Sequence, residues 1–239
     1  MAPFLPAAIL AGAVLFIFHS GRAADSADAC ELVRWVLKDE RDLKGIPFPD
    51  VVLAATGKKV IPVDPEKDAA WLERIGRALD RTLNALNEPE GKIHDTARVN
   101  EASRHVEDHL LAELNNEPGW KCSIPKNADG EDQRSGYPDL RLTMENGEVV
   151  YLDPKLYDSP SSTLRTFYYE PKTSTNKIRD DARHLLVAIR HSGKSGNDLR
   201  LLSWKFVDVS KIPVRLKAEF QASNNDMYRK ENIVGASKE

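Results

Sequence analysis

Residues 136 to 157 read GYPDLRLTMENGEVVYLDPKLY, two apolar runs that carry two carboxylates and a lysine and are joined by a turn. In the second run, polar and apolar positions alternate around Asp153 and Lys155. Alternate residues of a β-strand share one face of the sheet. We therefore expect Asp153 and Lys155 to point the same way, while Leu152 and Leu156 pack into a core on the other side.

The length of the turn decides where Asp139, on the first run, will lie. Asn146-Gly147 is typical of a hairpin turn. A two-residue loop would place Asp139 opposite Pro154 and on the wrong face of the sheet. A three-residue loop, Glu145-Asn146-Gly147, with its glycine in the left-handed conformation and a bulge, would place Asp139 opposite Asp153. We predict the three-residue loop, and hence one site shared by both acids.

These residue types suit a particular chemistry. Carboxylate oxygens are the ligands that Mg²⁺ prefers. A nearby ammonium can stabilise charge that develops on a phosphate, or can help to deprotonate a water. The pattern therefore predicts a site that binds Mg²⁺ or Mn²⁺ through Asp139 and Asp153 and cuts a phosphodiester with the help of Lys155.

Pro138-Asp139, thirteen further residues and then Asp153-Pro154-Lys155 resemble the motif of the PD-(D/E)XK nuclease superfamily, which includes type II restriction endonucleases. The resemblance implies Asp139 as the first acid, Asp153 as the second and Lys155 as the catalytic lysine. It also implies a core of a helix, a three-strand antiparallel meander, a helix and a further strand.

Pro154 departs from what a central strand normally carries, because proline has no N–H to donate to the ladder. Either its nitrogen faces the open site, or the strand is irregular there. In the superfamily, the main-chain carbonyl at this position often ligates the metal, so Pro154 joins the predicted metal ligands.

A helix is predicted over Thr96–Leu114, from apolar residues at helical spacing and a capping Asp95 or Thr96. Glu107 lies beside its apolar stripe. Many members of the superfamily carry an acid on this helix, followed by leucines and a glycine-aromatic pair, which Gly119-Trp120 resembles. The resemblance implies Glu107 as a third acid that binds metal or positions water. Two other acids of this helix are rivals, Glu101 and Glu113.

Four later segments complete the predicted core, which we place at residues 95–223. They are a first strand at Lys121–Pro125, a strand-like run at Phe167–Lys172, an amphipathic helix at Asn176–His191 and a strand at Leu199–Val209. The order predicts an α/β protein with a mixed α+β sheet and the restriction endonuclease-like order helix-strand-strand-strand-helix-strand.

Several side chains are candidates for contact with the substrate, for which we predict a nucleic acid, DNA. They are Arg134, Tyr168, Lys172 and Lys177. Lysine and arginine commonly bind phosphate, and a tyrosine can stack on a base or hydrogen-bond near the site. The net charge of -3 argues against a general, tight nucleic-acid coat, but local basic patches and bound metal can compensate.

The N-terminus suggests export. An apolar run from Phe4 to Phe18, followed by small residues, resembles a secretory signal peptide at residues 1–23. It is short for a membrane span, so we expect none in the mature chain. The predicted location is periplasmic or secreted, and the alternative is a membrane anchor formed by an uncleaved segment. In an oxidising compartment, Cys30 and Cys122 could pair, with two free thiols as the alternative.

Residues 24–94 are predicted to form a helical extension packed on the core. It contains helices near Cys30–Lys38 and Asp68–Leu86, with a loop at Ile46–Asp50 and a short strand near Lys59–Val63. Residues 224–239 are polar and are predicted to form a flexible tail. The function predicted for the whole chain is a Mg²⁺-dependent DNA endonuclease. The alternative is a non-catalytic exported binding domain that retains the nuclease fold.

Overall fold

The computed structural model describes residues 26–42, 44–96, 98–158, 167–171, 174–193, 199–217 and 222–235. The chain divides into two compact units. The larger unit spans Leu43–Leu216 and carries all the candidate catalytic residues, and the described residues before and after it belong to the smaller one. The larger unit therefore contains both the predicted helical extension from residue 43 onward and most of the predicted core. The boundaries proposed at residues 95 and 224 stay predictions.

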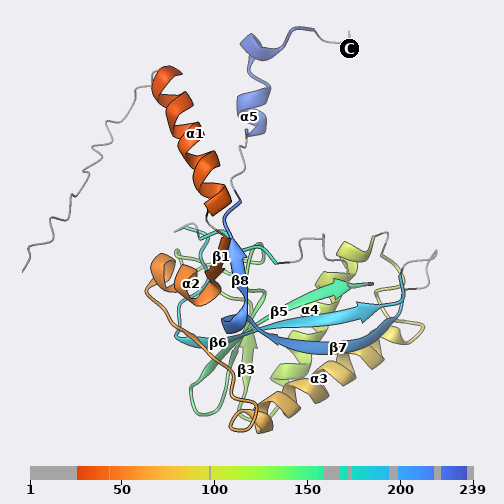
Figure 1. Cartoon of the computed structure of the whole chain (residues 1–239). Helices are drawn as coiled ribbons and strands as arrows, with labels where there is room; N and C mark the ends of the chain where they lie inside the picture. The colour runs from red at the N-terminus through yellow and green to blue at the C-terminus, as the bar shows by residue number, and fades with distance from the viewer. Residues whose placement is uncertain are drawn as a thin grey trace, which may run out of the picture. The chain divides into compact units, whose positions relative to one another are not determined.

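The larger unit is built around a six-stranded mixed sheet (Figure 1). Its strands are β2 (Val60–Ile61), β3 (Lys121–Ser123), β4 (Leu140–Thr143), β5 (Val149–Tyr157), β6 (Ala182–His191) and β7 (Leu201–Asp208). The path β2-β6-β5-β4-β3 is hydrogen-bonded in that order, and β7 also pairs with β6. The β3–β4–β5 meander is antiparallel, β6 runs parallel to β5 and β2, and β7 is antiparallel to β6. The predicted α/β class with a mixed sheet is thus observed.

The β4–β5 hairpin has the predicted three-residue loop. Its closing pair is Met144 and Glu148, with the Met144 N–H donating to the Glu148 carbonyl at 2.9 Å. Gly147 has a φ of 83°, a left-handed value that a glycine reaches without steric cost. The paired residues on β4 and β5, such as Leu140 with Leu152, continue in one register toward Asp139 and Asp153. The observed β4–β5 register is therefore the one that was predicted to bring these two acids onto one face of the sheet.

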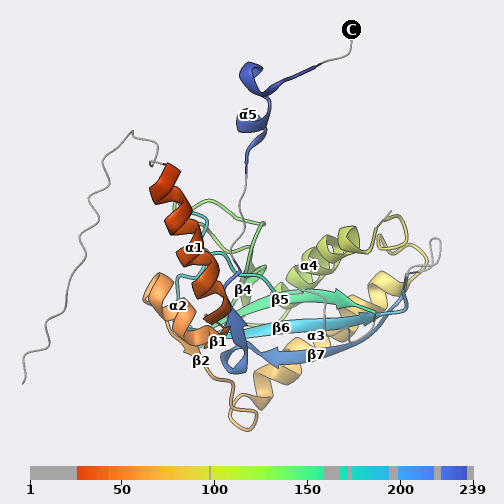
Figure 2. The same cartoon turned by 45° about the horizontal axis from the view of Figure 1, so that its top comes forward.

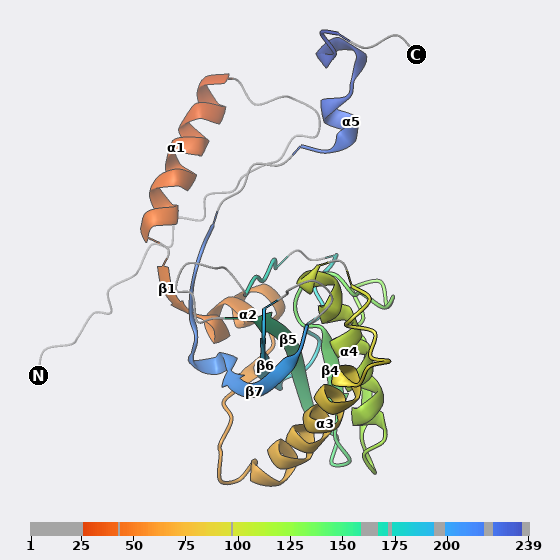
Figure 3. The same cartoon turned by 90° about the vertical axis from the view of Figure 1, so that its right-hand side faces the viewer.

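One face of the sheet is covered by α3 (Ala69–Asn87) and α4 (Val99–Asn115), which lie side by side (Figures 2 and 3). Both coincide closely with the predicted helices. Their apolar stripes bury leucines, isoleucine and tryptophan against the even-numbered side chains of β4 and β5, among them Leu142, Val150 and Leu152. We call this layer the helix-covered face. It holds the larger of the two apolar cores.

The opposite face is covered by α2 (Phe48–Thr56) and by loop segments rather than by long helices. Phe48, Tyr137, Tyr151 and Ile178 are buried here. Because β-strand side chains alternate, the odd-numbered residues of β5, including Asp153, share this face. We call it the loop-covered face.

The helix predicted at Asn176–His191 is wrong. Residues 176–181 have no regular secondary structure, and Ala182–His191 form β6. Apolar side chains from this strand enter both cores, so its sequence is nearly continuously apolar and carries no clean two-residue alternation. A short apolar run of this kind fits a helix and a buried strand equally well. The predicted order of elements is corrected accordingly: β6 takes the place of the second helix.

Three smaller segments also differ from expectation. Residues 167–171 of the predicted strand-like run have no regular secondary structure, and Lys172 lies outside the described residues. Ile46–Asp50, predicted as a loop, contains the end of β1 (Lys44–Pro47) and the start of α2. Pro49 in the first turn suits a helix start, because proline there loses no intrahelical hydrogen bond. β1 pairs with β8 (Pro213–Arg215) in a separate two-stranded sheet.

The smaller unit contains α1 (Ser26–Asp42), which includes the predicted Cys30–Lys38 helix, and the short α5 (Asn224–Met227). Cys30 is an exposed free thiol and Cys122 a buried one. They belong to different units, so their pairing stays a prediction, with two free thiols as the alternative. Burial raises the pKa of the Cys122 thiol to about 12. None of the helices in the described part of the chain is both long and apolar enough to cross a membrane.

Candidate active site

Asp139, Asp153 and Lys155 meet at the end of the β4–β5 hairpin on the loop-covered face. The Lys155 Nζ lies 3.3 Å from Asp139 Oδ2 and 2.6 Å from Asp153 Oδ2. Asp139 directly precedes β4, and Asp153 and Lys155 are alternate residues of β5. Leu152 lies in the core of the helix-covered face, and Leu156 packs against it. The shared orientation of Asp153 and Lys155, opposite to the leucines, is therefore confirmed.

Pro154 sits in a regular strand. The pairing of β5 with β6 continues in one register through Asp153, Pro154 and Lys155. On its other side, β5 pairs with β4 only up to Leu152, so Pro154 lies beyond the end of that ladder. A proline is tolerated where its missing donor would have faced no partner. The regularity of the strand rules out the second alternative, that β5 is irregular at this proline.

Glu107 extends from α4 toward the same group. Its side chain is partly buried, and burial together with the negative charge of Asp139 raises its pKa from 4.5 to about 7. The positive charges of Lys155 and Arg134 act in the opposite direction. Neither rival acid of this helix is placed in this way. Glu113 forms an ion pair with Arg81 of α3 at 2.6 Å, and Glu101 accepts a hydrogen bond from the Arg98 N–H at the start of α4.

Asp153 is the most deeply buried carboxylate of the group, with 1% of its side chain exposed. Burial, and then the charge of Asp139, raises the pKa of Asp153 well above its ordinary value. Burial alone would lower the pKa of Lys155, but the carboxylates of Asp153 and Asp139 outweigh it and raise that pKa. Lys155 therefore remains an ammonium between two acids that repel each other.

One observation indicates that Asp139 and Asp153 are suited to bind a divalent cation. Within the described residues, the buried Asp153 Oδ2 has no hydrogen-bond partner. Lys155 Nζ forms an ion pair with this oxygen at 2.6 Å. A buried carboxylate oxygen with free lone pairs, facing a second carboxylate, is a suitable ligand for Mg²⁺. The described side chains do not, however, gather three His, Cys, Asp or Glu residues tightly enough to enclose an ion.

Lys177 was predicted to contact the substrate from a helix, but it is buried, with 1% exposure. Its Nζ donates to the Gly136 carbonyl at 2.5 Å. Burial lowers the pKa of Lys177 to about 8, against the opposing influence of Asp139, Asp153 and Glu107. The ammonium is thus next to the acidic group and is not exposed to a substrate in this structure.

The other predicted substrate contacts have different environments. Arg134 is exposed and pairs with Asp108 of α4 at 2.8 Å. Asp108 is the residue that follows Glu107. Tyr168 is exposed at 44%, whereas Tyr169 packs against the core of the loop-covered face and accepts a hydrogen bond from Asn176. Lys172 lies outside the described residues.

Comparison with known proteins identifies the family. The sequence model of the type II restriction enzyme MjaV family matches residues 41–231. The curated type II restriction enzyme MjaV of Methanocaldococcus jannaschii is 30% identical over 209 residues, which cover 80% of this chain and 89% of that protein. The chain belongs to the type II restriction enzyme MjaV family. No solved structure matches it.

Membership of the MjaV family corrects the predicted location. Type II restriction enzymes normally work in the cytoplasm, which contradicts both a periplasmic or secreted location and the membrane-anchored alternative. The prediction rested on the apolar run within residues 1–23, which lies outside the described residues. An apolar run with small residues after it is a compositional signal only, and here it misled.

Several polar groups buried near the acids of this MjaV-family protein were not predicted from the sequence. Tyr137 and His184 share a hydrogen bond of 2.7 Å between Oη and Nδ1, and burial lowers the pKa of His184 to about 3. The Tyr151 hydroxyl donates to Asp180 at 2.7 Å and accepts from the Arg179 N–H at 3.0 Å. Tyrosines that alternate with core residues on β5 were the available signal, but their partners come from residues 179–184, where the secondary structure was predicted wrongly.

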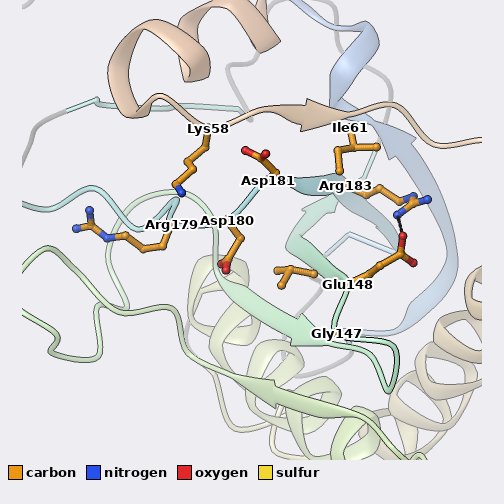
Figure 4. A pocket seen from close by; sticks show the side chains of 9 residues that line it. Lys58, Ile61, Gly147, Glu148, Arg179, Asp180, Asp181 and Arg183 are labelled. Atoms are coloured by element: carbon orange, nitrogen blue, oxygen red, sulfur yellow. Dashed lines mark hydrogen bonds and ion pairs between the residues drawn. The ribbon is translucent and has the colours of Figure 1, made fainter.

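A pocket of about 310 Å³ lies at the other end of β5, next to the hairpin turn (Figure 4). Its acids are engaged: Asp180 pairs with Arg141, Asp181 accepts from a main-chain N–H, and Glu148 pairs with Arg183. Lys58 and Arg179 contribute further positive charge to the lining. The pocket is polar and mixed in charge, and it lies apart from the three acids.

Proposed function

We propose that this protein is a metal-dependent DNA endonuclease of the PD-(D/E)XK type. The observation that carries the proposal is the group formed by Asp139, Asp153 and Lys155, with one ammonium within 3.3 Å of both carboxylates. The MjaV family match supports nuclease action on DNA, because type II restriction enzymes cut DNA.

The ligands for Mg²⁺ or Mn²⁺ would be the carboxylates of Asp139 and Asp153, the Pro154 carbonyl and Glu107. On an extended strand, the N–H and C=O of one residue point to the same side. If the nitrogen of Pro154 faces the open side beyond β4, its carbonyl faces that side too. When bound, the ion supplies an acidified water and neutralises charge on the scissile phosphate.

Lys155 acts as a cation in this proposal. Its two carboxylate neighbours favour the protonated form, so at neutral pH it donates hydrogen bonds and does not accept a proton. Its side chain is about one-third exposed, at 32%, so the ammonium can reach a phosphate oxygen at the mouth of the site. A positive charge fixed in a partly desolvated site stabilises the extra negative charge of the transition state.

Glu107 has a different role from the two aspartates. Its raised pKa leaves it partly protonated near pH 7 in the metal-free protein. A bound cation would favour its ionised form, because opposite charge lowers the pKa of a carboxyl. We assign Glu107 to binding metal or orienting water at the edge of the site.

Substrate contacts are proposed for side chains around this group. Arg134 lies beside the acids on an exposed loop and can contact a DNA phosphate. Tyr168 offers an exposed ring for stacking, and Lys172 is proposed from its sequence alone.

Cleavage of plasmid DNA tests the function. The full-length chain is incubated with Mg²⁺ or Mn²⁺, beside EDTA, and compared with Lys155→Met and with Lys126→Met as a matched control. Lys126 is an exposed lysine whose Nζ donates to the Gly130 carbonyl and pairs with Asp132, away from the acids. We expect metal-dependent cleavage by the wild type and by Lys126→Met, and none by Lys155→Met. Folded wild-type protein that cuts no DNA with either metal would refute the proposal.

A further inference from the structure

Lys177 is a fully buried lysine, and within the described part of the chain its ammonium donates to a main-chain carbonyl and not to a carboxylate. Its Nζ donates to Gly136 at 2.5 Å, and 1% of the residue is exposed. Burying an ammonium is costly unless opposite charge and hydrogen bonds compensate. In an exposed loop such a contact would mean little, but here the cost of burial requires an explanation.

The main chain on both sides of Lys177 is fixed to the loop-covered face. Asn176 is buried, and its side chain accepts from the Ile178 N–H at 3.0 Å and donates to the Tyr169 hydroxyl at 3.1 Å. The Arg179 N–H donates to the hydroxyl of Tyr151, a side chain of β5. The position of the Lys177 ammonium is therefore set by the same strand that carries Asp153.

The carbonyl that Lys177 binds lies three residues before Asp139. Gly136 has a φ of 78°, in the left-handed region that favours glycine, so the chain turns sharply where the ammonium holds it. Asp139 itself precedes the first residue of β4, so the ladder with β5 begins only after it. The sheet alone does not fix the segment from Gly136 to Asp139.

Charge completes the explanation for the buried ammonium. Lys177 interacts electrostatically with Asp139, Asp153 and Glu107, and it is repelled by Lys155. Three carboxylates and two lysines therefore share this part of the molecule. Lys155 contacts the two aspartates directly. Lys177 instead donates to the Gly136 carbonyl and influences the acids through its charge.

We propose that Lys177 is a positioning residue of the nuclease site. It holds the Gly136–Asp139 segment so that Asp139 stays opposite Asp153, and its charge offsets the repulsion among the three carboxylates. The inference rests on the function proposed above, and it replaces the earlier assignment of Lys177 to phosphate binding. Removing a residue that orients a metal ligand typically weakens metal binding or activity about 10- to 100-fold.

Metal binding and cleavage are measured separately for Lys177→Met. This variant retains much of the length of the side chain but neither its positive charge nor its hydrogen-bond donor. Lys177→Arg keeps both, and Lys126→Met repeats the loss of a lysine-to-glycine-carbonyl contact at an exposed position. Mn²⁺ affinity is determined by calorimetry without DNA, and the Mg²⁺ concentration for half-maximal cleavage by plasmid assay. DNA affinity is measured in EDTA.

For Lys177→Met we expect Mn²⁺ affinity about 10-fold weaker and a correspondingly higher Mg²⁺ requirement, with DNA affinity in EDTA unchanged. Lys177→Arg should recover most of the metal affinity, and Lys126→Met should match the wild type. A folded Lys177→Met protein with wild-type metal affinity and metal requirement would overturn the proposal. So would a loss confined to DNA affinity, which would mark Lys177 as a phosphate contact.

The wild-type protein offers a second measurement in case Lys177→Met does not fold. Bound Mn²⁺ broadens the NMR signals of nearby nuclei, so the side-chain signals of Lys177 and Lys155 should both broaden, and those of Lys126 should not. The Lys177 signal is identified by its loss in Lys177→Arg. If Lys155 broadens and Lys177 does not, the proposal fails. Wild-type protein that binds Mn²⁺ but cuts no DNA would refute the nuclease function and leave these metal measurements to decide the role of Lys177.

Discussion

The two faces of the central sheet differ in what they bury. The helix-covered face buries apolar side chains between β4, β5, β6 and the helices α3 and α4. The loop-covered face also buries Asp153, Lys177 and His184, each at most 1% exposed. Apolar burial stabilises a fold, while buried charge usually reduces stability unless it is well paired. We infer that one face supplies most of the stability and the other holds the chemistry.

The strongest test of this contrast is Asp153→Asn. Cleavage should fall at least about 100-fold, because the variant loses a charged group aimed at the reacting centre. The melting temperature in EDTA should stay the same or rise, because the buried charge and its repulsion from Asp139 are removed. Plasmid cleavage and thermal unfolding are measured on one preparation. A melting temperature that falls as far as that of a core truncation would contradict the division between the faces.

The neighbouring residue should behave in the opposite way. Leu152 is fully buried on the helix-covered face, so Leu152→Ala should reduce the free energy of unfolding by about 2–5 kcal/mol. The cleavage rate per folded molecule should remain within about threefold of the wild type, since the side chain points away from the site. Urea unfolding and active-site titration measure the two quantities. Leu202→Ala, at a residue 48% exposed on β7, is the control and should change neither.

A smaller effect is expected on the pH dependence of stability, to which the buried carboxylates contribute. The pKa of Glu107 is about 7 in the folded, metal-free protein against an ordinary 4.5. Between these values the unfolded chain has released the proton and the folded chain retains it, so stability should fall as pH rises through this window and level off above it. Asp153, with its raised pKa, acts in the same direction.

Melting temperatures measured in EDTA from pH 5 to 8 test this slope. Glu107→Gln should show a shallower decline, and Glu73→Gln, at an exposed position of α3, should follow the wild type. A Glu107→Gln curve parallel to the wild type would mean that this carboxyl does not experience the burial that the structure shows. Mg²⁺ should flatten the wild-type curve, because a bound cation favours the ionised acids.

The smallest expected effect belongs to the rim of the loop-covered face. Arg134→Ala should weaken DNA binding severalfold and reduce the salt dependence of binding by about one unit of slope, as expected for one phosphate contact. The melting temperature should not change, because exposed ion pairs such as Arg134 with Asp108 contribute little to stability. Arg77→Ala removes a similar exposed pair on α3 and should leave DNA affinity unaltered. Equal DNA affinity for all three proteins would remove Arg134 from the interface.

The hairpin with its acids could be predicted from sequence because its signals are local. The alternation around Asp153 and the Asn146-Gly147 turn together fix which residues face each other, and no distant contact can change that parity. β6 could not be predicted in the same way. Its apolar residues enter both cores, and only the presence of β5, β2 and β7 beside it favours a strand over a helix.

The candidate site residues also divide into those with a local sequence signal and those placed by distant contacts. Asp139, Asp153 and Lys155 lie within one hairpin, and Glu107 was found because it lies beside a helical stripe. Lys177 was singled out, but its burial depends on how residues 174–181 cross the sheet, which no pattern within that segment reveals. Tyr137 lies in the segment before β4 and His184 lies on β6, so they meet only in the assembled sheet and their pairing was outside the reach of local reasoning.

The three-residue turn Glu145-Asn146-Gly147 limits how this chain can vary. It lies about six residues from Asp139, roughly 20 Å along the strand, and surface loops normally tolerate insertions and deletions. Here the choice of closing pair decides the site, because the same sequence closed at Glu145 and Glu148, with Asn146-Gly147 as a two-residue loop, would bring Asp139 opposite Pro154 and turn it to the helix-covered side. Every candidate catalytic side chain would still be present in the sequence. Substitutions that preserve the three-residue loop are compatible with an intact site, whereas those that favour the two-residue loop are not. The conformation of this distant turn therefore decides whether the two acids share a face.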